Sequence, residues 1–256
     1  DVADEAIIGV MDYDFGNFKI QVTEEVDFSA GGLSPEPPLE AAPESQLRIA
    51  SYNVLNLSAV EPQRIARLAD QIVNHLASPD IIGLQEIQDN DGSQGQQAVS
   101  AVVTYQNIID AILALGGPQY GFVDIDPVQG ADGGIPLGNI RVGFLYRLDT
   151  GLTLAEAPHG DAKTPVEIQD VEGVPTLSLN PARLEPHDIA FYSSRKPLVV
   201  TFLYKEKPLF LINNHFASKG GDRALFGEFQ PPILDSEVQR LDQGRVVHDF
   251  VAELLA

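Results

Sequence analysis

An acid and an amide each come at or near the end of a short apolar segment in this sequence. Residues 81–84 predict a buried strand that runs directly into Gln85 and Glu86, and residues 48–54 predict another that ends near Asn53. An acid at the end of an apolar strand lies at the rim of a sheet, where α/β proteins bind their ligands. A partly desolvated carboxylate there is a natural ligand for a hard divalent cation such as Mg²⁺. The two strand ends therefore predict a metal-assisted phosphate site.

Two basic side chains later in the sequence could contact a phosphate. Arg195 precedes one apolar run, and its guanidinium is a planar fork of donors suited to phosphate oxygens. His215 follows another apolar run and precedes a polar, glycine-containing loop that could approach an anion. Plainer interpretations remain open for all four candidates: a turn former for Asn53, a surface acid for Glu86, a solvated charge for Arg195 and a structural role for His215.

Alternating strands and helices position these residues. A helix is predicted to open at Glu61-Pro62, because proline suits the first turn and Ile65, Leu68, Ile72 and Leu76 recur at helical spacing. Further helices are predicted over 96–115 and over 236–255, the latter with Ser236 as its cap. Strands are predicted over 120–124 and 141–146, and a hairpin joins 198–204 to 209–213 across 205–208. Mixed strands and helices with hairpins in the second half predict an α/β protein, with a sheet sandwich flanked by helices.

The N-terminal residues differ in character from the rest. Residues 8–22 resemble strands, whereas residues 32–45 are rich in Pro, Glu, Ala and Ser and predict an extended linker. We therefore expect residues 1–30 to be the tail of an upstream β-module or an N-terminal strand extension. The linker is placed at 31–45, and the main domain at 46–256.

The charge of the chain is unusual for a protein that binds phosphates. Its 256 residues include 37 acids against 16 Lys and Arg, a net charge of −21. This charge opposes simple binding to a phosphate backbone, although metal ions could bridge an acidic protein to a polyanion. The plainer interpretation is solubility in a salty or extracellular medium. The chain has no cysteine and no apolar run of 18 residues, so we expect no thiolate chemistry and no membrane span. Because it opens at Asp1 with no visible signal peptide, we interpret it as a mature or trimmed product.

Five ordered strings carry a family resemblance: SYNVLNL, PDIIGLQEI, IRVGFLYR, SSRKPLVVTF and LINNHFASKGGD. Together they resemble the endonuclease/exonuclease/phosphatase superfamily, which has the DNase I-like fold. The strings GVMDYDFGNFKIQV and LFGEFQPPILDSEVQRLDQGRVVHDFV are similar to the branch of large secreted bacterial nucleases and phosphoesterases. The resemblance implies two mixed sheets packed together and flanked by helices in four layers.

The same resemblance implies roles for individual residues. Glu86 and Asn53 match the metal-site positions, so the implied cofactor is Mg²⁺, Mn²⁺ or Ca²⁺. Arg195 matches the arginine of an Arg-x-Pro segment, and His215 matches a histidine that contacts the scissile phosphate and can serve as an acid. These four form the expected catalytic set. Further substrate contacts are expected from Asn214, Lys219 and Arg223. The implied activity is that of an extracellular nuclease that cleaves DNA, or RNA, by water attack on phosphate.

The sequence departs from the family pattern toward its end. The family continues with a Gly-Asp-x-Asn strand end and a Ser-Asp-His motif, whose Asp-His pair activates water, and neither motif occurs in this sequence. We therefore expect the front portion of a catalytic domain, with upstream and C-terminal domains in a longer polypeptide, and little activity from this chain alone. Three alternatives stay open: a phosphatase or phosphodiesterase acting on nucleotides or other phosphate esters, a truncated binding module, and, more remotely, a calcium-binding adhesion domain.

Overall fold

The structure is a computed structural model, and it describes residues 2–34, 36–41, 43, 45–95 and 98–256. The chain divides into two compact units. The first holds Asp1–Pro37 with Ser218–Gln239, and the second holds Pro38–Ala217 with Arg240–Ala256. Across the part of the chain that is described, no helix has the length and apolar character that a bilayer crossing requires. The domain limits expected at residues 30 and 45 stay a prediction.

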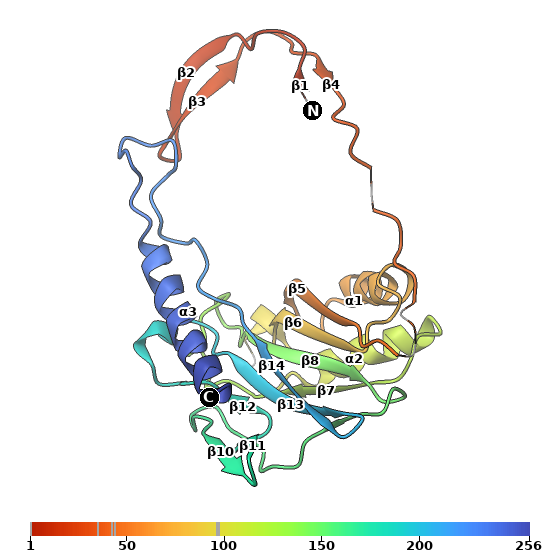
Figure 1. Ribbon diagram of the computed structural model, residues 1–256. Helices are drawn as coiled ribbons and strands as arrows, with labels where there is room; N and C mark the ends of the chain where they lie inside the picture. The colour runs from red at the N-terminus through yellow and green to blue at the C-terminus, as the bar shows by residue number, and fades with distance from the viewer. Residues whose placement is uncertain (1, 35, 42, 44, 96–97) are drawn as a thin grey trace. The chain divides into compact units, whose positions relative to one another are not determined.

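A mixed four-stranded sheet forms the first half of the second unit. Its strands lie in the order β5 (Ile49–Leu57), β6 (Ile81–Ile87), β8 (Arg141–Arg147) and β7 (Tyr120–Asp124) (Figure 1). The pair β5 and β6 is parallel, whereas β6 with β8 and β8 with β7 are antiparallel. Parallel neighbours need a crossover connection, and a helix between β5 and β6 provides it.

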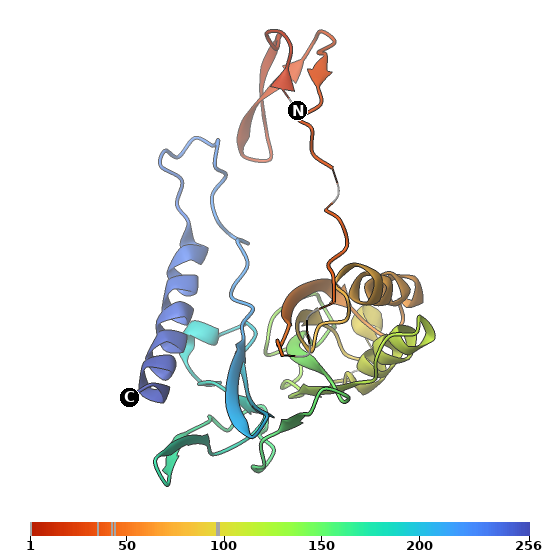
Figure 2. The ribbon, with the colours of Figure 1, turned by 45° about the vertical axis from the view of Figure 1, so that its right-hand side comes forward.

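Two helices cover one face of this sheet. Helix α1 (Pro62–Asp70) has the predicted proline in its first turn and continues into a π-helical turn (Gln71–His75). Helix α2 (Val102–Ala114) lies beside it (Figure 2). Their buried side chains pack against those of the sheet, and the cluster includes Ile65, Leu68, Ile72, Ile108, Ile112, Ile82, Leu84 and Leu145.

An antiparallel sheet packs on the opposite face. It contains β12 (Ala182–Arg183), β13 (Leu198–Tyr204) and β14 (Lys207–Asn213), and β9 (Leu152–Leu154) also pairs with β13. Side chains alternate between the two faces of a strand, so Val200 and Phe202 join the cluster between the sheets. There the rings of Phe144 and Phe202 meet edge to face, with centroids 6.0 Å apart.

The outer face of the second sheet carries a separate apolar cluster. Val199 of β13 belongs to it, with Leu177 from the hairpin of β10 (Ile168–Val171) and β11 (Val174–Leu177). Phe250 of helix α3 (Asp235–Leu254) packs against the same cluster. The layers are therefore helices, sheet, sheet and helix, which confirms the α/β class and the sandwich flanked by helices. The named strands of the second sheet pair antiparallel, and Arg183 of β12 also forms an isolated parallel bridge with Pro165.

Several predicted boundaries need correction. The strand predicted over 81–84 continues to Ile87, and the helix predicted from 96 begins at Val102, with Gln96 and Gln97 outside the described residues. Ser236 is not a helix cap, because α3 already begins at Asp235. Instead, the Ser236 backbone N–H and hydroxyl both donate to the carboxylate of Asp222, at 2.8 and 2.6 Å.

The first unit contains an amphipathic β-hairpin within the predicted strand-like region. β2 (Gly9–Asp14) pairs with β3 (Asn17–Val22), and the short strands β1 (Val2–Ala3) and β4 (Phe28–Ser29) pair nearby in the sequence. One face of the hairpin carries Met11, Tyr13, Phe18 and Ile20, each about half or more exposed.

The hairpin of β13 and β14 turns through two residues in left-handed backbone. Lys205 and Glu206 have φ of +52° and +65°, which matches the mirror-image turns that suit the twist of paired strands. Left-handed backbone costs an ordinary residue about 1 kcal/mol or more. We therefore expect Lys205→Asn with Glu206→Gly to raise the free energy of unfolding by up to about 1 kcal/mol, measured from urea midpoints.

A glycine at the neighbouring strand position provides the control. Lys207 begins β14 and pairs with Tyr204, so Lys207→Gly is expected to lower the unfolding midpoint. If the Asn-Gly turn instead lowers the midpoint as Lys207→Gly does, the assignment of this turn is wrong.

Candidate functional site

Glu86 lies at a bulge inside β6. The pairing of β6 with β8 shifts register between Gln85 and Ile87, and Glu86 has φ of +65°. Bulges of this kind re-aim a side chain and are common beside functional sites. A glutamate in the left-handed backbone region is also strained, by about 1–3 kcal/mol, and such strain clusters at active sites. The acid expected at the end of a strand is therefore held within the strand, by a distortion of its backbone.

Asn53 contacts Glu86 from the neighbouring strand. Asn53 pairs with Gln85 in the parallel ladder, so the following residue of β6 comes within reach of its side chain. Its Nδ2 donates to Glu86 Oε1 at 2.9 Å, and its Oδ1 accepts from the Leu55 N–H at 2.8 Å. Asn53 therefore forms a local turn, as one interpretation anticipated, and also orients the carboxylate.

The second sheet brings Arg195 and His215 together. Leu198 pairs with Asn213 in the β13–β14 ladder, so the segments before and after these residues lie side by side. Arg195 Nη2 donates to the Phe216 carbonyl at 2.7 Å, and His215 Nε2 lies 3.5 Å from Glu86 Oε1. Asn53, Glu86, Arg195 and His215, drawn from four separate segments, therefore form one cluster where strands of both sheets end.

A buried pair of amides joins the two sheets beneath this cluster. Gln85 Nε2 donates to Asn213 Oδ1 at 2.7 Å, and Asn213 Nδ2 donates to the carbonyls of Leu84 and Gly143 at 3.0 and 2.8 Å. Asn213 comes two residues before His215. The structure shows that it fixes the end of β14 against β6 and β8, and so fixes the positions of His215 and Glu86.

Burial and charge change the acid–base behaviour of the cluster. Burial lowers the pKa of His215, the nearby Arg195 lowers it further, and Glu86 opposes both. Burial also lowers the pKa of Arg195 from its ordinary value, against the opposing effect of Glu86 and Asp132. His215 is therefore predominantly neutral near pH 7, so its use as an acid requires an anion, such as a phosphoester, that raises its pKa again.

The pKa of the His215 ring should show these opposing effects of burial, Arg195 and Glu86. We expect the ring to titrate below the ordinary histidine pKa, and further below in Glu86→Gln, which removes the one charge that raises the pKa. Arg195→Met should raise the pKa, and Arg245→Met, at an exposed ion pair, should leave it unchanged. The measurement is a histidine proton–carbon NMR titration. A His215 ring that is still charged at pH 7 in the wild type would contradict this electrostatic account.

Buried polar atoms in the cluster lack partners. Within the described residues, Arg195 Nε, His215 Nδ1 and Asn214 Oδ1 are buried without a hydrogen bond. Asn214 otherwise donates from Nδ2 to the Ile212 carbonyl at 3.3 Å. Unpaired buried polar groups are costly, and where they occur in native proteins they often mark ligand or water sites. Two of these three groups can donate, which suits an anion.

The cluster fits a divalent cation through a single carboxylate. No group of three or more His, Cys, Asp or Glu side chains that could hold a metal occurs in the described ranges. Mg²⁺ commonly takes one or two carboxylates and keeps several waters. Glu86 Oε1 meets Asn53 and His215, whereas Oε2 has no hydrogen bond or ion pair to the residues described. Glu86 therefore suits the role of ligand, and Asn53 suits the role of orienting it.

The remaining two expected contacts belong to the first unit. Lys219 and Arg223 lie within Ser218–Gln239, and the Arg223 guanidinium lies over the Phe229 ring at 5.1 Å. Their expected role in binding substrate stays a prediction.

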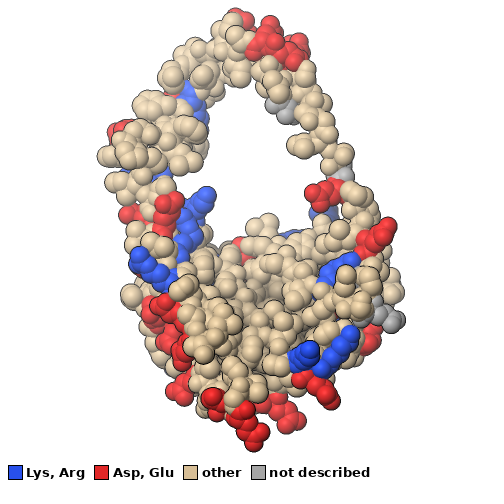
Figure 3. All heavy atoms as spheres, viewed as in Figure 1, with Lys and Arg blue, Asp and Glu red and all other residues tan. Residues whose placement is uncertain are grey.

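On the face drawn in Figure 3, acidic side chains gather at the lower end of the second unit, near β10 and β11.

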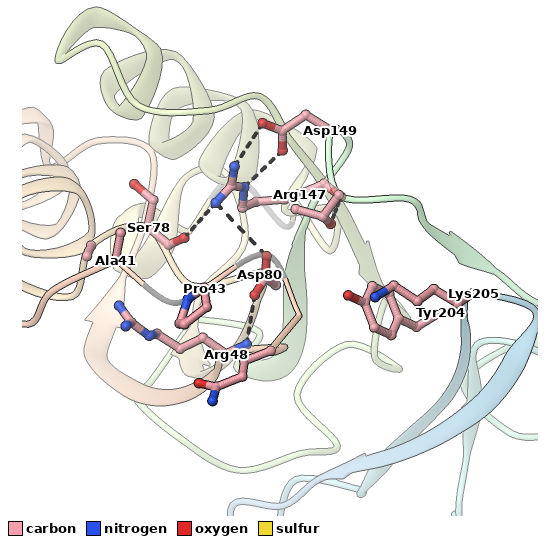
Figure 4. A pocket seen from close by; sticks show the side chains of 12 residues that line it. Ala41, Pro43, Arg48, Ser78, Asp80, Arg147, Asp149, Tyr204 and Lys205 are labelled. Atoms are coloured by element: carbon pink, nitrogen blue, oxygen red, sulfur yellow. Dashed lines mark hydrogen bonds and ion pairs between the residues drawn. The ribbon is translucent and has the colours of Figure 1, made fainter.

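A cavity lies at the other end of β6. Its volume is about 590 Å³, and Arg48, Asp80, Arg147 and Asp149 are among its lining residues (Figure 4). Arg147 donates to Asp149 through two nitrogens at 2.9 and 2.8 Å, and the Arg48 backbone N–H donates to Asp80 at 2.7 Å. Both of these acids are thus already bonded, and the Arg48 guanidinium donates to the carbonyls of Leu76 and Glu40. The cluster at Glu86, which holds buried polar atoms without a partner among the described residues, is the better candidate site.

The sequence has little similarity to proteins of known function. No protein-family model and no curated protein matches it. Among solved structures, an endonuclease/exonuclease/phosphatase family protein from Leptotrichia buccalis C-1013-b is similar, at 12% identity and a TM-score of 0.41. The match covers 77% of this chain and 62% of that one, so this chain spans less than two thirds of its length. A similarity of this extent leaves the function to be argued from the site itself.

Proposed function

We propose that this chain carries the metal-binding and phosphate-binding residues of a divalent-metal-dependent phosphoester hydrolase. Its proposed substrate is nucleic acid, with DNA preferred to RNA. The observation that carries the proposal is the convergence of Glu86, Asn53, Arg195 and His215 from four separate segments. These four are also the positions that the family resemblance singles out. The similarity to secreted nucleases extends the proposal to an extracellular setting.

Each residue has a distinct part in this proposal. Arg195 and His215 bind phosphate oxygens, because both carry buried donors or ring nitrogens without a partner in the described chain. Glu86 would hold Mg²⁺, Mn²⁺ or Ca²⁺, with Asn53 fixing its carboxylate. The bound ion would stabilise the charge that develops on phosphate and leaving group. Once phosphate raises its pKa, His215 can donate a proton to the leaving oxygen.

Binding experiments test these residues directly. The water-activating Asp-His pair of the family pattern is not in this sequence, so hydrolysis is assayed in the full-length protein. The 256-residue chain itself should bind Mn²⁺, followed by electron paramagnetic resonance, and inorganic phosphate, followed by calorimetry. Arg195→Met should weaken phosphate binding, and Arg245→Met should not. A wild-type chain that binds neither ligand would refute the proposal.

The strong acidity favours a second candidate, a phosphatase or phosphodiesterase on small esters. A net charge of −21 repels a long polyanion more than a single phosphate group. Plasmid DNA, RNA and p-nitrophenyl phosphate, each with and without EDTA, separate the candidates. Metal-dependent cleavage of the small ester alone would favour the second. Metal binding with no turnover in the full-length protein would favour a binding module.

A further inference from the structure

Helix α3 carries one buried polar side chain near the candidate site. Of the described residues 240–256, Gln243 alone is buried, with no solvent exposure at all. The residues around it on the helix are charged or only partly buried, as Arg240, Asp242 and Arg245 show. A fully buried glutamine is uncommon, and it must satisfy both ends of its amide to be tolerated there.

The Gln243 amide bonds to two different loops. Its Nε2 donates to the Ala190 carbonyl and to the Ser194 hydroxyl, each at 2.9 Å. Its Oε1 accepts from the Ala217 N–H at 2.8 Å. The first two partners lie in the segment that leads directly into Arg195. The third lies two residues after His215.

A site residue makes a further hydrogen bond between the two loops. Arg195 Nη2 donates to the Phe216 carbonyl, which lies between His215 and Ala217. That bond uses the guanidinium that we propose to bind phosphate. Gln243, by contrast, holds both loops through backbone groups and a buried hydroxyl, and its own backbone belongs to a helix.

We infer that Gln243 is a positioning residue, which holds the Arg195 loop and the His215 loop at the separation that phosphate binding requires. The inference rests on the proposed function for the identity of the ligand, and on the hydrogen bonds alone for the geometry. Small displacements of groups that bind a reacting phosphate cost up to about 100-fold in rate. Gln243 therefore governs the site without touching substrate.

The competing explanation is that Gln243 only anchors α3 to the rest of the unit. Phe250 of the same helix packs on the outer apolar cluster, so Phe250→Leu weakens the docking of α3 without removing a bond to either loop. This variant is the matched control. A structural role predicts that Gln243→Leu and Phe250→Leu behave alike, whereas a positioning role predicts that only Gln243→Leu disturbs the site.

The experiment follows the two site side chains by NMR and the affinity for inorganic phosphate by calorimetry. In Gln243→Leu, the Arg195 Nε–H signal and the His215 ring signals should shift, and phosphate affinity should fall about 10- to 100-fold. Gln243→Asn keeps an uncharged amide that is one methylene shorter and should show a smaller effect, which covers the case in which the leucine variant does not fold. Phe250→Leu should leave signals and affinity close to those of the wild type.

Each outcome decides the inference. It is overturned if the folded Gln243 variants keep wild-type signals, or if Phe250→Leu shifts them equally. If the wild-type chain binds neither Mn²⁺ nor phosphate, the proposed function fails, and the Arg195 and His215 signals still decide the role of Gln243. In the active full-length protein, Gln243→Leu should raise KM and lower kcat together, and Phe250→Leu should change neither.

Discussion

Glu86→Ala is expected to lower metal-dependent phosphoester hydrolysis by about 100-fold or more. A bound divalent ion supplies several kcal/mol of charge stabilisation, and about 1.4 kcal/mol corresponds to a factor of ten in rate. Glu86 provides the only carboxylate of the described cluster, so its removal should also abolish tight Mn²⁺ binding. The measurements are initial rates with Mg²⁺ or Mn²⁺ for the full-length protein, and Mn²⁺ affinity for the 256-residue chain.

The variant Glu86→Gly tests whether the loss of metal binding and activity is separate from a loss of folding. Glycine adopts φ near +65° without the strain that glutamate bears, which offsets the loss of the bond from Asn53. We therefore expect Glu86→Gly to unfold at a denaturant midpoint close to that of the wild type while it loses Mn²⁺. Wild-type turnover in either variant, with magnesium or manganese, would show that Glu86 is not the metal ligand.

Asp132→Ala is expected to destabilise the second unit by about 3–5 kcal/mol, because it would leave two buried cations unpaired. Asp132 accepts from Lys196 Nζ at 2.9 Å and pairs with Arg183 Nη1 at 3.0 Å. The three side chains are between 2% and 9% exposed. Lys196 also donates to the carbonyls of Ala131 and Ser194 at 3.2 and 3.1 Å, so the network holds the segment that carries Arg195. Urea unfolding followed by circular dichroism measures the change.

The exposed pair of Arg245 and Asp242 provides the control. Its side chains are 66% and 45% exposed, and exposed ion pairs contribute about 0–1 kcal/mol. Asp242→Ala should therefore leave the unfolding midpoint nearly unchanged. Replacing all three buried groups together, by Asp132→Leu, Arg183→Met and Lys196→Met, should recover much of the lost stability. A single Asp132→Ala variant as stable as Asp242→Ala would contradict the account of this network.

Local sequence signals account for the elements that were predicted well. The strand over 120–124 was confirmed, and α1 begins at its predicted proline. The hairpin predicted across 205–208 was also confirmed, with a shorter turn, because β14 already begins at Lys207. Each depends on residues close in sequence: alternating apolar side chains, turn residues or a first-turn proline. The start of α2 was placed too early, because residues 98–101 are not helical although their composition permits a helix. Propensity is a weak signal where tertiary contacts compete.

The groups that hold the site in place were not visible in the sequence. Asp132, Arg183 and Lys196 are far apart along the chain and have the residue types of an ordinary surface. Gln243 likewise lies in a stretch of polar helix. Polar residues inside otherwise apolar strands, such as Gln85 and Asn213, were a signal that could have been followed further, since buried polar groups need partners.

The sequence by itself indicated the class of fold, because apolar periodicity is a local property of the chain. It indicated the four residues at which chemistry is expected through their places beside apolar runs and through the family resemblance of five ordered strings. The tertiary structure alone decided how those residues meet. The bulge at Glu86 depends on pairing with β8, the approach of Arg195 to His215 depends on the register of β13 with β14, and the bonds of Gln243 depend on where α3 docks. Contacts between residues so far apart are set by packing across the two sheets, and no local pattern specifies them.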